Sequence, residues 1–118
     1  MLVLVTGPVG RFSGSSELEY TDRLANIARA CEAVWRKGHI PVSGVHQAYP
    51  MLDFVEGGQD RKIDTVAGVC LGIAARCDAV VAIAMSSGVK QEIAELEGRG
   101  RPVYHSVAEL PAAGQDAD

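Results

Sequence analysis

Residues 76–94 read RCDAVVAIAMSSGVKQEIA, and this stretch decides the fold class. The continuous apolar run at 79–85 predicts a strand that is buried on both faces. The small polar residues 86–88 then break the run, and helical periodicity follows from 89 to 99. A buried strand, a short turn and a helix form the repeating unit of an α/β fold.

The same unit recurs along the chain of 118 residues. Strands are predicted at 2–5, 40–45, 79–85 and 102–104, and helices at 17–37, 59–76 and 89–99. This alternation predicts a single-domain α/β fold, a three-layer sandwich whose parallel sheet of four to five strands carries helices on both faces, as in flavodoxin-like and Rossmann-like folds. The domain covers 1–110, and the small and polar residues 111–118 are expected to form a flexible tail.

Charge and cysteine content narrow the class of protein. The net charge of −4, without any basic run, argues against a nucleic-acid partner. Cys31, Cys70 and Cys77 have no metal-binding spacing and suit a reducing compartment. The apolar start at 2–5 is too short for a signal sequence or a membrane span. We therefore expect a cytoplasmic protein with neither a membrane nor a nucleic acid as partner.

Three predicted loops follow the carboxyl ends of the strands, at 7–16, 46–59 and 86–88. Parallel sheets bind ligands outside the carboxyl ends of their strands. The loop at 46–59 is also long for a compact domain, which is typical of a functional loop. These loops together predict the position of the site.

The turn before the last long helix carries Ser86, Ser87 and Gly88, and Glu92 follows within the helix. Small hydroxyl residues at a helix start cap the helix, and its unpaired N–H groups can also hold an anion. Glu92 has Val89 three residues before it, so it is not part of a capping box. It is either a solvated carboxylate favoured by the helix dipole or a nucleophile toward an electrophilic sugar carbon.

The loop after the first strand contributes Gly7, Gly10 and Arg11. Glycines let the backbone approach a ligand and Arg11 can clamp a phosphate, although a plain turn with a solvated arginine fits the spacing equally well. The spacing matches neither a dinucleotide fingerprint nor a P-loop, and the three histidines are too scattered for a metal site, so no cofactor is predicted. Among the histidines, His46 follows the second strand and is the candidate for substrate contact.

Several segments together resemble one family. They are VTGPV at 5–9, WRKGH at 35–39, RCDAVV at 76–81, SSGVKQE at 86–92 and GRPV at 100–103. In order and spacing, the chain resembles the nucleoside 2-deoxyribosyltransferase-like superfamily over nearly all of residues 1–110. The resemblance implies cleavage of an N-glycosidic bond in a nucleotide or nucleoside, with Glu92 as the nucleophile that forms a glycosyl-enzyme ester.

The residue six positions before the glutamate separates two activities in that family. The resemblance associates aspartate there with deoxyribosyltransferases and serine with nucleoside 5′-monophosphate N-glycosidases, since a hydroxyl accommodates a phosphate that a carboxylate repels. Ser86 therefore favours a nucleotide hydrolase, and base exchange on a nucleoside is the alternative. Relatives complete their sites with a neighbouring subunit, so the resemblance also implies a homodimer or a larger homo-oligomer.

Two positions depart from the family pattern. Cys70 stands where relatives often carry a substrate-contacting aspartate, and Lys90 where related hydrolases often have glycine. A thiol supplies neither the charge nor the hydrogen bond of a carboxylate. A module that binds a nucleotide without cleaving it is therefore a second hypothesis. A flavodoxin-like or receiver-like domain ranks third, because receiver domains need paired acids after the first strand.

Overall fold

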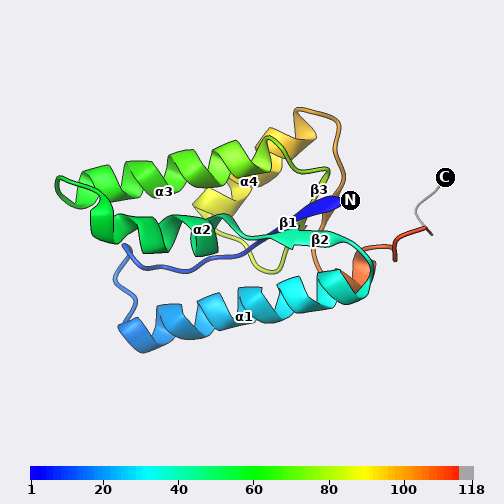
Figure 1. The fold of residues 1–118 in the computed structure, drawn as a ribbon, viewed down its shortest axis with the longest axis horizontal. Coiled ribbons are helices and arrows are strands. Elements are labelled where there is room, and N and C mark those ends of the chain that lie inside the picture. Colours follow the sequence, from blue (N-terminus) through cyan, green and yellow to red (C-terminus); the bar gives the residue numbers. More distant parts are fainter. Residues whose placement is uncertain (115–118) are drawn as a thin grey trace.

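The computed structural model describes residues 1–114, and a parallel sheet of four strands lies at its centre (Figure 1). The strands are β1 (Leu2–Thr6), β2 (Ile40–Val42), β3 (Ala79–Ala82) and β4 (Val103–Tyr104). Their order in the sheet is β2-β1-β3-β4, and every neighbouring pair is parallel. The predicted parallel α/β sheet is confirmed, with four strands.

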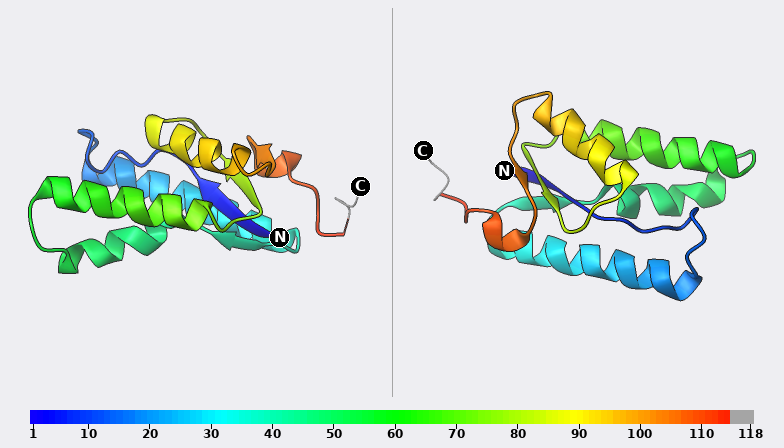
Figure 2. Two further views of the ribbon diagram at one scale, coloured as in Figure 1. Left: turned by 90° about the horizontal axis from the view of Figure 1, so that it is seen from above. Right: turned by 180° about the vertical axis from the view of Figure 1, so that it is seen from behind.

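Helices connect these strands, and a last short helix follows β4 in the described part of the chain. They are α1 (Glu17–Arg36), α2 (Gly44–Met51), η1 (Leu52–Phe54), α3 (Gln59–Ala74), α4 (Ser87–Glu97) and η2 (Val107–Glu109). Figure 2 shows α1 on one face of the sheet and α3 with α4 on the other, which confirms the three layers. None of the helices within residues 1–114 has both the length and the hydropathy that crossing a membrane requires.

Side chains of the two central strands alternate between the helix layers. Val3, Val5 and Val81 belong to the core on the α1 side, whereas Leu4 and Val80 belong to the core beneath α3 and α4. All five are at most 1% exposed. Burying a side chain of this size stabilises the fold by about 1.5–3 kcal/mol. Because both faces are covered, the strands show no alternation of apolar and polar residues, as the sequence indicated.

The structure corrects the predicted second strand and the loop after it. β2 ends at Val42, and the segment predicted as a loop at 46–59 contains α2, η1 and the start of α3. Ser43 caps α2, because its Oγ accepts a hydrogen bond from the backbone N–H of His46 at 3.4 Å. The chain therefore turns directly from the strand into a helix.

Two features obscured α2 in the sequence. Pro50 suggested a loop, but it stands in the last turn of the helix, where it removes a single backbone hydrogen bond. The fully buried apolar side chains of this segment are few: Ala48 in α2 and Leu52, four residues later, at the start of η1. The apolar residues near the end of this segment thus belong to a packed helix.

Two smaller differences concern β3 and α1. β3 ends at Ala82, three residues before the predicted end, so residues 83–85 form the approach to α4. Apolar residues recur at helical spacing from Leu24 to Trp35, which predicts Trp35 on the buried stripe of α1, but Trp35 is 60% exposed. Ile27 and Val34 define the buried line of α1, and Trp35 lies about 100° around the helix axis from Val34.

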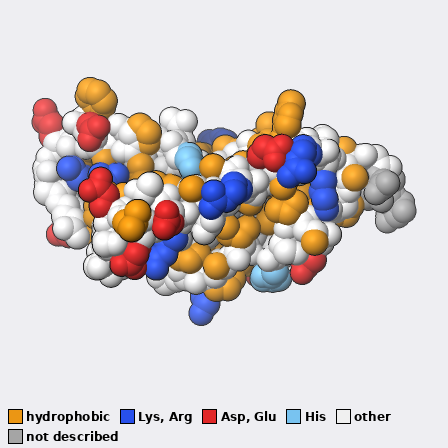
Figure 3. Space-filling view, turned by 90° about the horizontal axis from the view of Figure 1, so that it is seen from below, with side chains coloured by type: hydrophobic (Ala, Val, Ile, Leu, Met, Phe, Trp, Pro, Cys, Tyr) orange, Lys and Arg blue, Asp and Glu red, His pale blue; other side chains and the backbone are white. Residues whose placement is uncertain are grey.

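The outer face of α1 carries charges of both signs. Figure 3, which looks onto this face, shows acidic and basic side chains interspersed with apolar ones. Two ion pairs at helical spacing join Arg23 to Glu19 at 3.7 Å and Arg36 to Glu32 at 2.8 Å. Such exposed pairs contribute about 0.3–0.5 kcal/mol each, so they support the helix only slightly.

Polar contacts close the edge of the sheet that lies at the amino ends of the strands. The backbone N–H of Leu2 donates to Asp78 Oδ2 at 2.8 Å, so Asp78 has a structural role at this edge. Lys37 Nζ donates to the carbonyl oxygens of Val107 and Leu110 at 2.6 Å each. The end of the described chain is thereby held against the end of α1.

The first residues of the predicted flexible tail take part in this closure. His39 is buried, and its Nε2 donates to the carbonyl oxygen of Pro111 at 2.7 Å. The backbone N–H of Ala113 donates to the carbonyl oxygen of Lys37 at 2.7 Å. Residues 115–118 of the predicted tail lie outside the described residues.

Candidate functional site

A cavity of about 300 Å³ opens at the carboxyl ends of β1 and β3. The strand order reverses here, because β2 lies on one side of β1 and β3 on the other. Open α/β sheets bind ligands at such a point. The walls come from the loop at 7–13, from α2 and α3, and from the start of α4. The cavity thus lies at the edge of the sheet that the loops predicted.

Glu92 lies on the buried face of α4 and lines this cavity. The buried residues of α4 are Val89, Glu92, Ile93 and Leu96, so the carboxylate occupies a position in an otherwise apolar stripe. Its side chain is 7% exposed, which excludes a solvated surface carboxylate. Thr6 Oγ1 donates a hydrogen bond to Glu92 Oε1 at 2.7 Å. A buried carboxylate therefore faces the cavity with one oxygen already bound.

Burial changes the protonation of Glu92. Removal from water raises the pKa of this carboxyl group to about 7, and the hydrogen bond from Thr6 opposes the rise. Both protonation states of Glu92 are therefore populated near neutral pH. A pKa displaced in this way, in a cavity, is typical of functional carboxylates.

Ser86 is the N-cap of α4, and it also lines the cavity. Its Oγ accepts a hydrogen bond from the backbone N–H of Val89 at 3.2 Å, so the predicted capping role is confirmed. The hydroxyl proton of Ser86 is still free to be donated to a ligand. Gly88 lines the cavity too, whereas Ser87 is exposed and lies outside its lining.

The loop after β1 brings Gly7, Gly10 and Arg11 to the cavity. Gly10 has a φ of 77°, and a Cβ there would collide with Ser15 Oγ and lie 2.7 Å from an amino nitrogen of Arg23. A Cβ on Gly7 would lie 2.9 Å from Cγ1 of Ile83. The glycines are thus required by close approaches within the protein itself.

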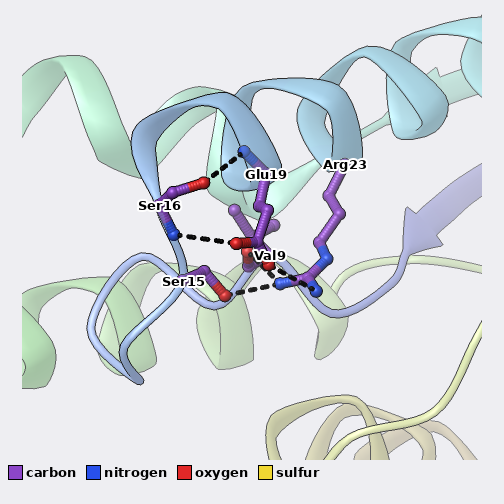
Figure 4. A network of polar contacts seen from close by, with 5 residues as sticks. All are labelled: Val9, Ser15, Ser16, Glu19 and Arg23. Atoms are coloured by element: carbon purple, nitrogen blue, oxygen red, sulfur yellow. Dashed lines mark hydrogen bonds and ion pairs between the residues drawn. The ribbon is translucent and has the colours of Figure 1, made fainter.

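Arg23 holds this loop against α1 (Figure 4). Its Nη1 donates to the carbonyl oxygen of Val9 at 3.1 Å and to Ser15 Oγ at 2.7 Å. Ser16 and Glu19 form a capping box at the start of the helix. Arg23 lies outside the buried line of α1, and its long side chain reaches back from the second turn to the loop. The loop wall of the cavity is therefore fixed by side-chain contacts.

Arg11 packs on aromatic rings at the cavity. Its guanidinium carbon lies 5.0 Å from the ring centre of Tyr49, 5.7 Å from that of Phe12 and 6.0 Å from that of Tyr20. These distances are typical of cation–π contacts, so Arg11 is not the solvated arginine of a plain turn. Burial raises the pKa of the Tyr49 hydroxyl to about 12, and the positive charge of Arg11 opposes that rise. Tyr49 was not among the site residues predicted from the sequence, because it lies on the unpredicted helix α2.

The wall formed by α3 is apolar. Ile63, Val66 and Ala67 line the cavity at helical spacing with Cys70, so this apolar stripe of α3 faces the cavity. Cys70 is buried, and this burial, together with the charge of Glu92, raises the pKa of its thiol to about 12. At neutral pH the Cys70 thiol is therefore protonated and is a poor nucleophile.

The remaining predicted contact, His46, lies outside the cavity lining. It is exposed in the first turn of α2, and its Nδ1 lies 2.7 Å from Ser43 Oγ. Val45 and Tyr49, four residues apart on the same helix, face the cavity instead. His46 is rotated away from them because successive residues of a helix differ by about 100°.

The arrangement combines an apolar wall, a fixed arginine, a helix N-terminus and a buried carboxylate that is half ionised near neutral pH. Such a site can hold a ligand that has an apolar body and an anionic group, next to a buried carboxylate. Within residues 1–114, no three side chains among His, Cys, Asp and Glu are grouped to hold a metal ion. Comparisons with protein-family models, curated proteins and solved structures found no match to this chain.

Proposed function

We propose that this protein hydrolyses the N-glycosidic bond of a nucleoside 5′-monophosphate, with Glu92 as the nucleophile. The strongest support is the carboxylate of Glu92, which is buried, hydrogen-bonded to Thr6 and in contact with a cavity at the switch point of the sheet. A carboxylate in the apolar stripe of a helix is costly to fold. Its placement is explained if chemistry requires it there.

The reaction proceeds in two displacements. One oxygen of Glu92 bonds to the anomeric carbon while the carbon–nitrogen bond breaks, and its electron pair goes to the base, which takes up a proton from solvent. A water molecule then attacks the anomeric carbon, the ester bond to Glu92 breaks, and the surplus proton of the water goes to solvent. The negative charge of Glu92 stabilises the oxocarbenium-like transition state of each step.

The cavity walls suit the two ends of a nucleotide. The apolar α3 wall, with Val66 and Ala67, offers a surface for a base. Ser86 at the start of α4 can donate its hydroxyl proton to a phosphate oxygen, and the helix N-terminus favours a negative charge. Arg11, held in place by aromatic rings, offers a second positive group.

Base release tests the proposal directly. Ribo- and deoxyribonucleoside 5′-monophosphates are incubated with the wild type, Glu92→Gln and Glu97→Gln, and free bases are separated by chromatography. Glu97 is exposed on the same helix and is the matched control. We expect release by the wild type and Glu97→Gln and a loss of at least about 10³-fold in Glu92→Gln, because the amide cannot form the ester. Equal release by all three would refute the role of Glu92.

Two related activities give different results in the same assay. Base exchange would require a free deoxynucleoside together with an acceptor base, and it would transfer the sugar to that base. A nucleotide-binding module would bind a monophosphate, measured by calorimetry, and would release no base. The neutral thiol of Cys70 in the cavity wall favours this second candidate, since it cannot replace a substrate-binding carboxylate.

We also propose that a second copy of the chain closes the open side of the site. Met51 and Phe54 are 39% and 87% exposed at the end of α2 and in η1, and Ile63 on the cavity wall is 38% exposed. Large apolar side chains grouped on a surface are typical of an interface. Light scattering at several concentrations gives the mass: a dimer that Phe54→Ser weakens is expected, and a wild-type monomer at high concentration would contradict it.

A further inference from the structure

The register of β1 directs the side chain of Thr6 toward α4. Leu4 belongs to the core beneath α3 and α4, and Thr6 lies two residues further on the same face of the strand. Its backbone is fixed in the centre of the sheet, where Thr6 pairs with Ala82 and accepts a hydrogen bond from the N–H of Ile83 at 2.9 Å. Thr6 is therefore held rigidly beneath Glu92.

The hydrogen bond between these residues distinguishes the two oxygens of Glu92. Thr6 Oγ1 donates to Oε1 at 2.7 Å, and both side chains are buried. Oε2 receives no hydrogen bond from the described residues. Among these residues, every fully buried side-chain nitrogen or oxygen has a hydrogen-bond partner, so Oε2 is not fully buried. Oε2 is therefore accessible from the cavity, because Glu92 lines that cavity. One oxygen is anchored, and the other is open to a ligand.

We propose that Thr6 is a positioning residue: its hydroxyl anchors Oε1, presents Oε2 to the anomeric carbon and favours the ionised form of the carboxylate. This inference rests on the proposed reaction for its purpose, although the hydrogen bond can be tested without any substrate. A donated hydrogen bond favours the charged form of a carboxylate, so it offsets part of the effect of burial.

Other titratable groups lie on the elements around the same carboxylate, and they remain constant in the test. Cys70 on α3 lines the cavity as a neutral thiol, and Cys77 at the end of that helix has its pKa raised to about 11, mainly by burial. Arg11 and Tyr49 also line the cavity. A change confined to Thr6 therefore separates its hydroxyl from these neighbours.

The experiment replaces Thr6 and follows the titration of Glu92. Thr6→Val removes the hydroxyl at nearly constant volume, Thr6→Ser retains it, and Thr65→Val removes a hydroxyl that bonds only to the carbonyl of Arg61 in α3. The full-length protein is labelled with carbon-13 at the glutamate carboxyl carbons, and the resonance missing in Glu92→Gln identifies Glu92. We expect Thr6→Val to raise the pKa of Glu92 by about one unit, and Thr6→Ser and Thr65→Val to leave it unchanged.

The pH profile of base release gives a second readout. A rise of about one unit reduces kcat/KM of Thr6→Val about tenfold at pH 6, where ionised Glu92 is scarce. At pH 9.5 Glu92 is ionised in both proteins, so the loss of kcat/KM that is due to ionisation disappears. Any loss of kcat/KM that persists at this pH measures the contribution of Thr6 to the orientation of Glu92. Thr6→Ser should restore the wild-type profile. If Thr6→Val does not fold, Thr6→Ala serves as the hydroxyl-free variant.

The outcomes separate this inference from the proposed reaction. An unchanged Glu92 pKa in Thr6→Val overturns the inference, even if base release depends on Glu92. A raised pKa in Thr6→Val and in Thr6→Ser alike also overturns it, because packing and not the hydroxyl would be responsible. A rise in Thr6→Val alone, in a protein that releases no base, supports the control of Glu92 by Thr6 and rejects the reaction.

Discussion

At the scale of single residues, burial of Glu92 places a carboxylate at the cavity but lowers the stability of the fold when that carboxylate is ionised. Its pKa of about 7 in the folded protein, compared with an ordinary value of 4.5, means that folding disfavours its charge. A difference of this size corresponds to about 3 kcal/mol when the group is fully ionised. The folded state binds the proton more tightly than the unfolded state, so the contribution of Glu92 to stability is complete below about pH 4.5 and is lost as the pH rises through 7.

We therefore predict that Glu92→Gln is more stable than the wild type at high pH. The amide oxygen still accepts the hydrogen bond from Thr6 but carries no charge, so the gain in free energy of unfolding approaches about 3 kcal/mol at pH 9. The gain is still close to this value at pH 7, falls between pH 7 and pH 4.5, and is nearly absent below pH 4.5. Urea unfolding at pH 5, 7 and 9 measures the difference.

Glu97→Gln is the control for that measurement, since Glu97 is exposed on the same helix. A surface substitution of this kind changes stability by less than about 0.5 kcal/mol and should show no transition near pH 7. Equal stabilities of the wild type and Glu92→Gln at pH 9 would mean that burial of the carboxylate carries no such cost.

At the scale of elements, Gly44 controls the contact between α2 and α3. A Cβ on Gly44 would lie 2.8 Å from Cys70 Sγ and 3.0 Å from Cys70 Cα. The second contact is with backbone, so a rotamer change of Cys70 does not relieve it. The absence of a side chain at Gly44 thus lets α2 begin directly against α3, beside the cavity wall.

We predict that Gly44→Ala destabilises the protein by about 1–3 kcal/mol, because the two helices must separate. Gly68→Ala is the matched control: Gly68 lies inside α3, and a Cβ there would meet nothing within 4 Å, so alanine should stabilise the helix by about 0.5–1 kcal/mol. Denaturant unfolding compares both variants with the wild type. Two variants of equal stability would contradict the close contact at Gly44.

Helical periodicity made α1, α3 and α4 predictable, whereas α2 is too short for a clear pattern and contains a proline. Because α2 was not predicted, the directions of its side chains could not be deduced. Tyr49 was therefore not among the predicted site residues, and His46 was expected at a cavity that it does not line. Glu92, Ser86 and Arg11 were found because they follow strand ends or match the resemblance. Thr6 was missed as a partner of Glu92, since 86 residues separate the pair and only the sheet register brings them together.

At the scale of the whole molecule, the helices are longer than the sheet. The five residues of β1 span about 17 Å. The 20 residues of α1 extend about 30 Å. Figure 1 shows α1, α2 and α3 continuing past the carboxyl ends of the strands, where the cavity lies. At the other end, Lys37 holds the carbonyls of Val107 and Leu110. One end of the molecule forms the site, and the opposite end closes the core.

This division predicts that damage to the closed end lowers stability without changing the site. Leu110 is 1% exposed and belongs to the core on the α1 side, so Leu110→Ala should reduce the free energy of unfolding by about 2–4 kcal/mol. Leu18→Ala is the control, because Leu18 is 72% exposed and its removal should cost less than about 0.5 kcal/mol. Urea unfolding gives the stabilities, and the carbon-13 titration gives the pKa of Glu92 in each folded variant. That pKa should stay at its wild-type value in Leu110→Ala, since Leu110 does not line the cavity; a shifted pKa would show that the two ends are coupled through the sheet.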